Sequence, residues 1–299
     1  MYNIDRLFES VAAKGHVCVG LDTAAEYVPP AERQRSGSDA EAVLAFNKAL
    51  IDSTFDAAAC YKVQIAYYEE MGIAGLSVYA QTLRYLREKG ALVIADIKRG
   101  DIADTALRYA KAHFEGDFEA DFVTLSPYMG MDSIEPWLGY ADSKGKGAFV
   151  LMRTSNKGMR DFEYLEVSSE KKRLYHAVGD KLAALADAHS GKYGYGAFGA
   201  VLGCTERDEA AAIRKQYSNL FFLIPGYGAQ GGAADDAALL LREGNGGVVN
   251  ASRSILKAWS AEIHNSGADE STVTNTFAAE AARRAALAMR DAIGAAVKK

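Results

Sequence analysis

ALVIADIKRGD, residues 91–101, decides the fold, because it joins a short apolar run directly to a cluster of charges. Its first part, ALVIAD, has the length and composition of a buried β-strand, and residues 76–90 before it show helical spacing of apolar side chains. The same unit recurs at intervals of about twenty to about fifty residues, enough for a crossover helix. The other apolar runs are HVCVGL (16–21), AACYKV (58–63), DFVTLS (121–126), GAFVLM (147–152), GAVLG (199–203), LFFLIP (220–225) and GGVVNA (246–251).

Eight alternating strand and helix units predict an α/β fold in which a parallel sheet closes into a (β/α)8 TIM barrel. A chain of 299 residues suits one such barrel, and no linker divides it, so we expect a single domain over residues 1–299. The Ala-rich tail, 269–297, is expected to form the last helix. The segments 23–38 and 154–168 are expected to be long loops after the first and fifth strands.

The composition argues against nucleic-acid and membrane partners. The 34 basic and 39 acidic residues give a net charge of -5, and Lys and Arg are scattered along the sequence. No apolar run is long enough to cross a bilayer, and the start of the chain, MYNIDRLFES, lacks the apolar core of a signal peptide. The three cysteines lie within or beside apolar runs, as buried thiols do in a reducing compartment, so we expect a cytoplasmic protein.

Charged residues stand at the ends of the first three predicted strands. Asp22 follows the first strand, Lys62 belongs to the second, and Asp96, Lys98 and Asp101 end the third. Alternate residues of a strand face the same side, so Asp96 and Lys98 are expected to point together into the barrel mouth. One such charge would more often belong to a structural ion pair, but burying several alternating charges is costly unless every member is paired. We therefore predict a catalytic site here, where barrel enzymes carry their active sites.

The segment PGYGAQGG, residues 225–232, follows the seventh predicted strand and contains the pattern G-x-G-x-x-G. A dinucleotide-binding site is one interpretation, but the next strand ends in Asn250 instead of the acidic residue that would bind a ribose. We favour a phosphate-binding loop, because glycines let backbone N–H groups approach an anion and Arg253 follows the eighth strand. Loops seven and eight are the common phosphate site of barrels.

The remaining candidates for chemistry are weaker. The five histidines are scattered, and none stands at metal-ligand spacing from a carboxylate, so we expect no metal site. The neighbouring Tyr67 and Tyr68 fit core packing. Chemistry is therefore expected to depend on the charged strand ends and on the glycine-rich loop.

These motifs together resemble those of the orotidine 5′-phosphate decarboxylase family. ADIKRGDIADT, residues 95–105, is similar to the family signature D-x-K-x-x-D-I-x-x-T, and GLD, YKV, RTSN, PGYGAQGG and NASRSI occur in the order that the family uses. The similarity extends over residues 17–256, and the long segments after the first and fifth strands are similar to those of a longer bacterial subgroup. The resemblance implies decarboxylation of orotidine 5′-phosphate to UMP, the last step of de novo pyrimidine nucleotide synthesis, without a metal or an organic cofactor.

The resemblance also implies roles for individual residues. Lys98 would deliver a proton to C6 of the pyrimidine. Asp96 and Asp101 would flank it, and Lys62 would complete the alternating charges. Asp101 and Thr105 would reach into the active site of a neighbouring subunit, which implies a homodimer with shared active sites. The implied substrate contacts are Asp22 and Lys62 to the ribose hydroxyls, Ser155 to the pyrimidine, and Tyr227, Gln230 and Arg253 to the phosphate.

Three other functions remain open from the sequence. The first is a sugar-phosphate synthase or decarboxylase of the same barrel superfamily, which would use a divalent metal to stabilise an enediolate. The second is a nicotinamide-binding protein that uses GYGAQG, and the third is a non-catalytic nucleotide-binding barrel. We prefer the cofactor-free decarboxylase, because loss of CO₂ from C6 leaves an electron pair that needs a fixed positive charge, and Lys98 would supply it.

Overall fold

Eight parallel strands form a closed barrel in the computed structural model, which describes residues 1–169, 171–228 and 232–298. Their order around the barrel is β1-β10-β9-β8-β5-β4-β3-β2. The barrel strands are β1 (Val17–Gly20), β2 (Cys60–Gln64), β3 (Val93–Arg99), β4 (Phe122–Leu125), β5 (Gly147–Arg153), β8 (Phe198–Leu202), β9 (Phe222–Ile224) and β10 (Gly247–Ala251). Each overlaps one of the predicted runs, so the prediction of a (β/α)8 barrel in a single domain is confirmed.

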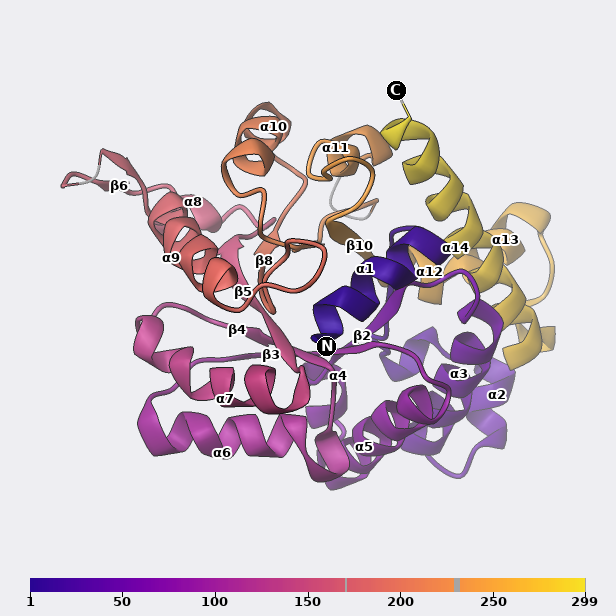
Figure 1. Ribbon diagram of the computed structural model, residues 1–299. Helices are drawn as coiled ribbons and strands as arrows, with labels where there is room; N and C mark the ends of the chain where they lie inside the picture. Colours follow the sequence, from indigo (N-terminus) through magenta and orange to yellow (C-terminus); the bar gives the residue numbers. More distant parts are fainter. Residues whose placement is uncertain (170, 229–231, 299) are drawn as a thin grey trace.

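Helices surround the barrel strands (Figure 1). They are α1 (Asn3–Lys14), α2 (Pro30–Arg35), α3 (Asp39–Thr54), α4 (Ala66–Glu69), α5 (Gly72–Glu88), α6 (Ala103–Phe114), α7 (Glu135–Lys144), α8 (Met159–Phe162), α9 (Leu174–Ala188), α10 (Arg207–Gln216), α11 (Ala234–Ala238), α12 (Arg253–Leu256), α13 (Ala258–Ser266) and α14 (Asn275–Val297). The last helix begins at Asn275 and not at residue 269, because the hydroxyl of Thr274 accepts the N–H of Phe277 and caps it there.

Two buried apolar layers hold the fold together. The outer layer lies between strands and helices, where residues such as Val19, Phe46 and Leu83 are fully buried. The inner layer fills the barrel, and Ile4 and Leu7 of α1 pack in it with interior strand residues. This side of α1 therefore packs against the apolar residues inside the barrel. Polar side chains of the strands, such as Lys62, Asp96 and Asn250, instead line a cavity at the carboxyl ends of the strands.

The long segments after β1 and β5 contain more structure than the predicted loops. The first holds a 3-10 turn, Ala25–Tyr27, and the helix α2, which begins at a proline. The second holds α8 and a small antiparallel ladder of β6 (Glu166–Val167) and β7 (Lys172–Arg173), which projects from the barrel at the upper left of Figure 1. Both segments are long excursions after β1 and β5, as predicted, but they are not loops throughout, because each contains short regular elements.

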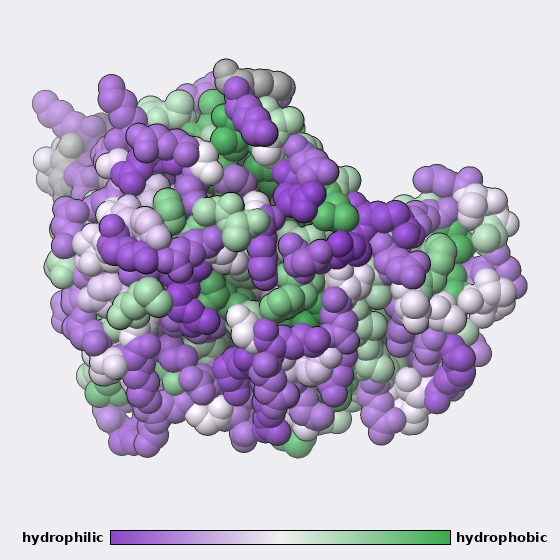
Figure 2. Space-filling model, turned by 45° about the vertical axis from the view of Figure 1, so that its right-hand side comes forward, coloured by the Kyte–Doolittle hydropathy of each residue, from purple (hydrophilic) through white to green (hydrophobic). Residues whose placement is uncertain are grey.

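The surface is mainly polar on the face seen in Figure 2, where hydrophobic side chains show in small separate areas among the coloured residues. Among the helices that the structure describes, none is both long enough and apolar enough to cross a membrane. The longest is α14, with 23 residues, and it alternates buried alanines with exposed charged residues.

Candidate active site

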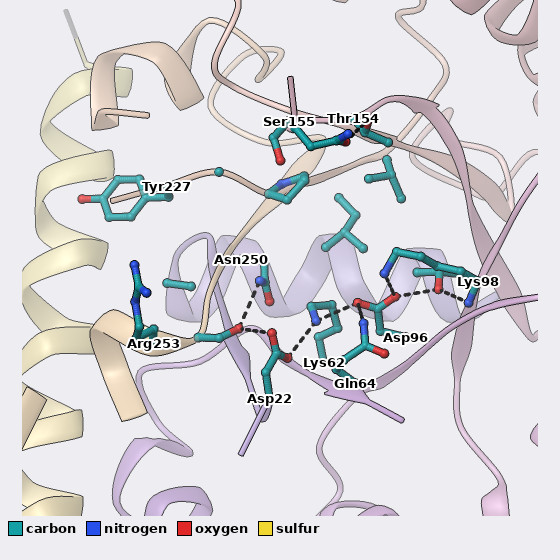
Figure 3. A pocket seen from close by; sticks show the side chains of 18 of the residues that line it. Asp22, Lys62, Gln64, Asp96, Lys98, Thr154, Ser155, Tyr227, Asn250 and Arg253 are labelled. Atoms are coloured by element: carbon teal, nitrogen blue, oxygen red, sulfur yellow. Dashed lines mark hydrogen bonds and ion pairs between the residues drawn. The ribbon is translucent and has the colours of Figure 1, made fainter. Parts of the chain in front are cut away.

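A cavity of about 490 Å³ lies at the carboxyl ends of the barrel strands, a volume that suits a small ligand (Figure 3). In Figure 3, Lys98 lies toward one end of the cavity, Tyr227 and Arg253 lie toward the other, and Ser155 stands across from the charged row. The predicted site residues that line the cavity are Asp22, Lys62, Asp96, Lys98, Ser155, Tyr227 and Arg253. Strands far apart in sequence thus bring these residues together.

Asp96, in the middle of β3, is the centre of the charged end of the cavity. Its Oδ2 accepts hydrogen bonds from Lys62 Nζ at 2.8 Å and Gln64 Nε2 at 2.9 Å. Its Oδ1 accepts from Lys98 Nζ at 2.6 Å and from the Thr124 hydroxyl at 2.8 Å. Burial opposes the charge of Asp96, but the two ammonium groups outweigh it and hold the pKa of Asp96 well below its usual range. Asp96 is therefore a buried, ionised carboxylate.

Lys62, on β2, is buried between two carboxylates. Its Nζ lies 3.0 Å from Asp22 Oδ1 and 2.8 Å from Asp96 Oδ2. Burial would lower the pKa of Lys62, but Asp22 and Asp96 outweigh that effect and raise the pKa above its ordinary value. One ammonium group therefore pairs with both carboxylates.

Lys98 reaches the cavity through an irregular piece of strand. The pairing of β3 with β4 shifts register between Ala95 and Arg99, and the φ angle of Lys98 is 44°, in the left-handed region. The Lys98 side chain is 48% exposed, and its Nζ contacts Asp96. The prediction that Asp96 and Lys98 point together is confirmed, but the alternation of a regular strand is not the whole reason.

A polar row continues from Asp22 to the last strand of the barrel. Asp22 Oδ2 accepts a hydrogen bond from the Ser252 hydroxyl at 2.9 Å, and Asn250 Nδ2 donates to Ser252 Oγ at 3.5 Å. The complete row, drawn with dashed lines in Figure 3, runs through Asn250, Ser252, Asp22, Lys62, Asp96 and Lys98. Its groups include donors and acceptors suited to the hydroxyls of a sugar.

The described part of the glycine-rich loop after β9 contributes Pro225, Gly226 and Tyr227 to the other end of the cavity. Gly226 and Gly228 have φ angles of 100° and 69°, which only glycine adopts readily, and both are hydrogen-bonded to Gly232 across the loop. Arg253 begins α12 at the exposed rim of the cavity, and Tyr227 is half-buried beside it in the lining. The predicted phosphate contact Gln230 lies outside the described residues.

The segment after β5 brings Ser155 to the cavity wall. The N–H and the hydroxyl of Thr154 both donate to the carboxylate of Glu163, each at 2.8 Å, which fixes the turn that contains Ser155. One residue earlier, the buried Arg153 donates from Nη2 to the carbonyl of Gly203 at 2.8 Å. This bond ties the end of β5 to the end of β8.

Glu209, on α10, holds the rest of this segment in place. Its Oε2 accepts hydrogen bonds from Arg153 Nη1 at 3.1 Å, Tyr164 Oη at 2.8 Å and Tyr175 Oη at 3.1 Å, and its Oε1 is paired with Arg173. Burial opposes the charge of Glu209, but the hydrogen bonds from Tyr164 and Arg173 outweigh it and lower the pKa of Glu209.

Replacing Glu209 by glutamine is expected to lower the free energy of unfolding by about 3 kcal/mol, because Arg153, whose side chain is fully buried, loses its charge partner. The matched control is Glu206→Gln on the exposed pair Arg160–Glu206, for which we expect a loss of at most about 1 kcal/mol. Urea unfolding followed by circular dichroism measures both. Equal losses in the two variants would show that the buried guanidinium does not depend on Glu209.

Two predicted site residues are not brought to the cavity within one chain. Asp101 accepts a hydrogen bond from the N–H of Ile102 at 2.9 Å, and Thr105 is exposed on α6. Neither residue lines the cavity formed by the described part of the chain. Of the four alternating charges expected from the sequence, Lys62, Asp96 and Lys98 are in contact within one chain. The fourth, Asp101, does not join them.

Several cavity residues escaped the sequence analysis. Gln64 stands two residues after Lys62 and so faces the same side of β2, a signal that the strand period could have given. Thr124 and Ser252 are short polar residues in or beside apolar runs, and nothing local distinguishes them. Tyr67 was assigned to the core, but it also lines the cavity, whereas Tyr68 is a core residue that donates to the carbonyl of Leu21.

The chain has the features of a TIM-barrel enzyme: a closed parallel barrel with a charged and polar cavity at the carboxyl ends of its strands. The model of one family, described as "Orotidine 5'-phosphate decarboxylase / HUMPS family", matches residues 15–262. The chain belongs to this family.

Curated relatives and solved structures agree with this assignment. An orotidine 5'-phosphate decarboxylase of Clostridium perfringens (strain SM101 / Type A) is 54% identical over 295 residues, 99% of each chain. One of Clostridium kluyveri is 56% identical over 259 residues, 87% of this chain and 89% of the relative. The OMP decarboxylase structure of Leishmania donovani is similar at 31% identity with a TM-score of 0.74, covering 100% of both chains. A putative orotidine 5'-phosphate decarboxylase from Streptomyces avermitilis is similar at 30% identity and a TM-score of 0.78, covering 99% of this chain and 95% of the other.

Proposed function

We propose that this chain decarboxylates orotidine 5′-phosphate to UMP, the last step of de novo pyrimidine nucleotide synthesis, without a cofactor. The observation that carries the proposal is the ammonium group of Lys98, held 2.6 Å from the ionised Asp96 and half exposed to the cavity. The glycine-rich loop and Arg253 at the other end suit a phosphate. A substrate with a carboxylate at one end and a phosphate at the other fits this distribution of charge, and the names of the relatives support it.

The proposed step needs only one proton donor. The bond between C6 and the carboxylate carbon breaks, CO₂ leaves, and the electron pair of that bond stays at C6. The ammonium of Lys98 gives its proton to C6, which yields UMP, and the amine takes a new proton from water. A unit charge at about 4 Å in an effective dielectric of about 20 contributes roughly 4 kcal/mol, on the order of a thousandfold in rate. Because Asp96 already fixes Lys98, little reorganisation is needed.

The remaining acceleration is assigned to binding energy and to Asp96. Phosphate binding at Arg253 is remote from C6, so its energy can hold the substrate carboxylate against the charged end of the cavity. There the ionised Asp96 repels the carboxylate of the substrate, and the repulsion disappears when neutral CO₂ leaves. Lys62 keeps Asp96 ionised and in place.

The other cavity residues are assigned to substrate binding. Ser155 stands across from the charged row and would contact the pyrimidine. The row from Asn250 to Lys62 offers donors and acceptors to the ribose hydroxyls. We assign Asp22 and Lys62 to the ribose, Ser155 to the pyrimidine, and Tyr227, Arg253 and the undescribed Gln230 to the phosphate.

We further propose that two chains form a homodimer with shared active sites. Asp101 and Thr105 lie outside the cavity of their own chain and are free to approach another. Ile102 and Leu107 beside them are 44% and 47% exposed, so these two residues adjoin apolar surface that a second chain could cover. Asp101 of each chain would then complete the alternating charges around Lys98 of the other.

The cysteines support a place in the cytoplasm. Cys18, Cys60 and Cys204 are all buried and all free thiols. Unpaired buried thiols are typical of proteins that remain in a reducing compartment.

The alternatives fit the structure less well. A metal-dependent sugar-phosphate enzyme needs carboxylates that are available to a cation, whereas Lys62 binds both Asp22 and Asp96. A nicotinamide site of the G-x-G-x-x-G type belongs to an open doubly wound sheet, whereas this sheet is a closed barrel. Of the three, the non-catalytic barrel can be tested only by an assay of activity.

The decisive assay is incubation of the purified protein with orotidine 5′-phosphate. We expect complete conversion to UMP, followed by the change in ultraviolet absorbance and by chromatography, at the same rate with and without EDTA. Loss of the activity in EDTA and its return with a divalent metal would favour the metal-dependent enzyme. Tight UMP binding with no turnover would favour the non-catalytic barrel.

A further inference from the structure

We propose that Thr124 is a positioning residue for Lys98, and that its single hydroxyl fixes both the backbone of Lys98 and the carboxylate that binds the Lys98 amine. The kinetic part of this inference rests on the proposed function, and the structural part does not. Thr124 belongs to β4, is 1% exposed and contributes to the cavity lining.

The hydroxyl of Thr124 makes three contacts. Its oxygen accepts the N–H of Ile97 at 3.0 Å and the N–H of Lys98 at 2.9 Å. Its own hydrogen is donated to Asp96 Oδ1 at 2.8 Å. A hydroxyl has one donor and two acceptor positions, so all of its capacity is used. Because an amide N–H can only donate, the direction of the hydroxyl hydrogen toward Asp96 is forced.

These contacts replace a piece of the β-ladder. Ile94 and Ala95 of β3 pair regularly with Phe122 and Val123 of β4, but the next pair is Arg99 with Leu125. The N–H groups of the intervening residues therefore have no regular partner in β4, and the side chain of Thr124 takes two of them. An unpaired buried N–H is costly, so this hydroxyl stabilises the irregular strand.

The irregularity gives Lys98 its unusual backbone. A φ of 44° is unfavourable for a residue with a side chain, and such a conformation persists only when its surroundings determine it. Thr124 holds the Lys98 N–H on one side and Asp96 Oδ1 on the other, and the Lys98 amine binds that same Oδ1. The Thr124 hydroxyl thus holds the backbone of Lys98 directly and holds the Lys98 amine through Asp96 Oδ1.

Two substitutions distinguish the effect of the Thr124 hydroxyl from the effect of the side-chain volume. Thr124→Val keeps the volume and removes all three contacts, and Thr124→Ser keeps the hydroxyl. We expect Thr124→Val to lower kcat by about 100-fold with little change in KM, because the proton donor is displaced while the phosphate end is intact. Thr124→Ser should retain kcat within about fivefold. The control is Thr54→Val, which removes a buried hydroxyl of α3 that bonds the carbonyl of Leu50 away from the cavity.

Each rate is expressed per site that binds UMP, measured by isothermal titration calorimetry, so that partial unfolding is not counted as slow chemistry. On this scale Thr54→Val should match the unchanged protein. The exchange of the C6 hydrogen of UMP for deuterium in D₂O, followed by NMR, should slow in Thr124→Val and recover in Thr124→Ser. A Thr124→Val protein that binds UMP fully and keeps kcat within threefold would overturn the proposal.

A crystal structure of the unchanged protein tests the same idea if Thr124→Val does not fold. We expect a positive φ at Lys98 with the N–H groups of Ile97 and Lys98 both bonded to the Thr124 hydroxyl. A regular extended strand at Lys98 would overturn the proposal whatever the protein's activity. If these contacts are found but the protein does not decarboxylate orotidine 5′-phosphate, the proposed function fails and the structural inference stands.

Discussion

Lys98→Ala is expected to lower kcat for the decarboxylation of orotidine 5′-phosphate by at least about a thousandfold, while UMP still binds. The reason is that the substitution removes both the positive charge beside C6 and the proton that C6 must receive. The cavity should otherwise be preserved, because Asp96 keeps its hydrogen bonds from Lys62, Gln64 and Thr124. Single-turnover kinetics and UMP titration of the same sample measure the two properties separately.

The control for this experiment is Lys144→Ala, which removes a surface ammonium on α7 that pairs with Glu115. That variant should keep the full rate. Lys98→Ala with a rate within tenfold of the unchanged protein would refute the proposed proton donor. Loss of UMP binding together with activity would instead show that Lys98 mainly shapes the cavity.

The barrel could be predicted from the sequence because its strands are short and apolar and recur with helical segments between them. The run ALVIAD, for example, has the composition of a buried parallel strand. The charged end of the site could be predicted for a related reason. Asp22, Lys62 and Asp96 interrupt or end apolar runs, and a closed barrel brings all strand ends to one place. Local sequence and topology were together sufficient for these residues.

The contacts that could not be predicted from the sequence join residues that are far apart in the chain and meet only in the folded structure. Thr124 is one more β-branched residue in DFVTLS, and its role appears only when β4 lies beside the irregular part of β3. Glu209 is likewise an ordinary helical glutamate until α10 faces the buried Arg153. The left-handed backbone of Lys98 has no signal in its own sequence, because no glycine or asparagine stands there.

Because Asp101 lies outside the cavity of its own chain, we expect two inactive variants to restore activity to each other in a mixed dimer. Asp101→Ala and Lys98→Ala should each be nearly inactive alone, yet a mixture refolded together should recover about a quarter of the full activity. In the proposed mixed dimer, one site would combine Lys98 of one chain with Asp101 of the other and would be complete. Half of the randomly paired dimers are mixed, and each has one complete site of two.

The matched control mixes Lys98→Ala with Asp96→Ala, whose side chains meet within one chain. Neither site of that mixed dimer is complete, so we expect no recovery, although mixed dimers form equally well. Differently tagged chains, separated by two affinity steps, give the amount of mixed dimer in each sample. If the Asp101→Ala mixture also stays inactive while mixed dimers are present, Asp101 acts within its own chain. The shared active site would then be wrong, and the loop after β3 would have to move in order to bring Asp101 to Lys98.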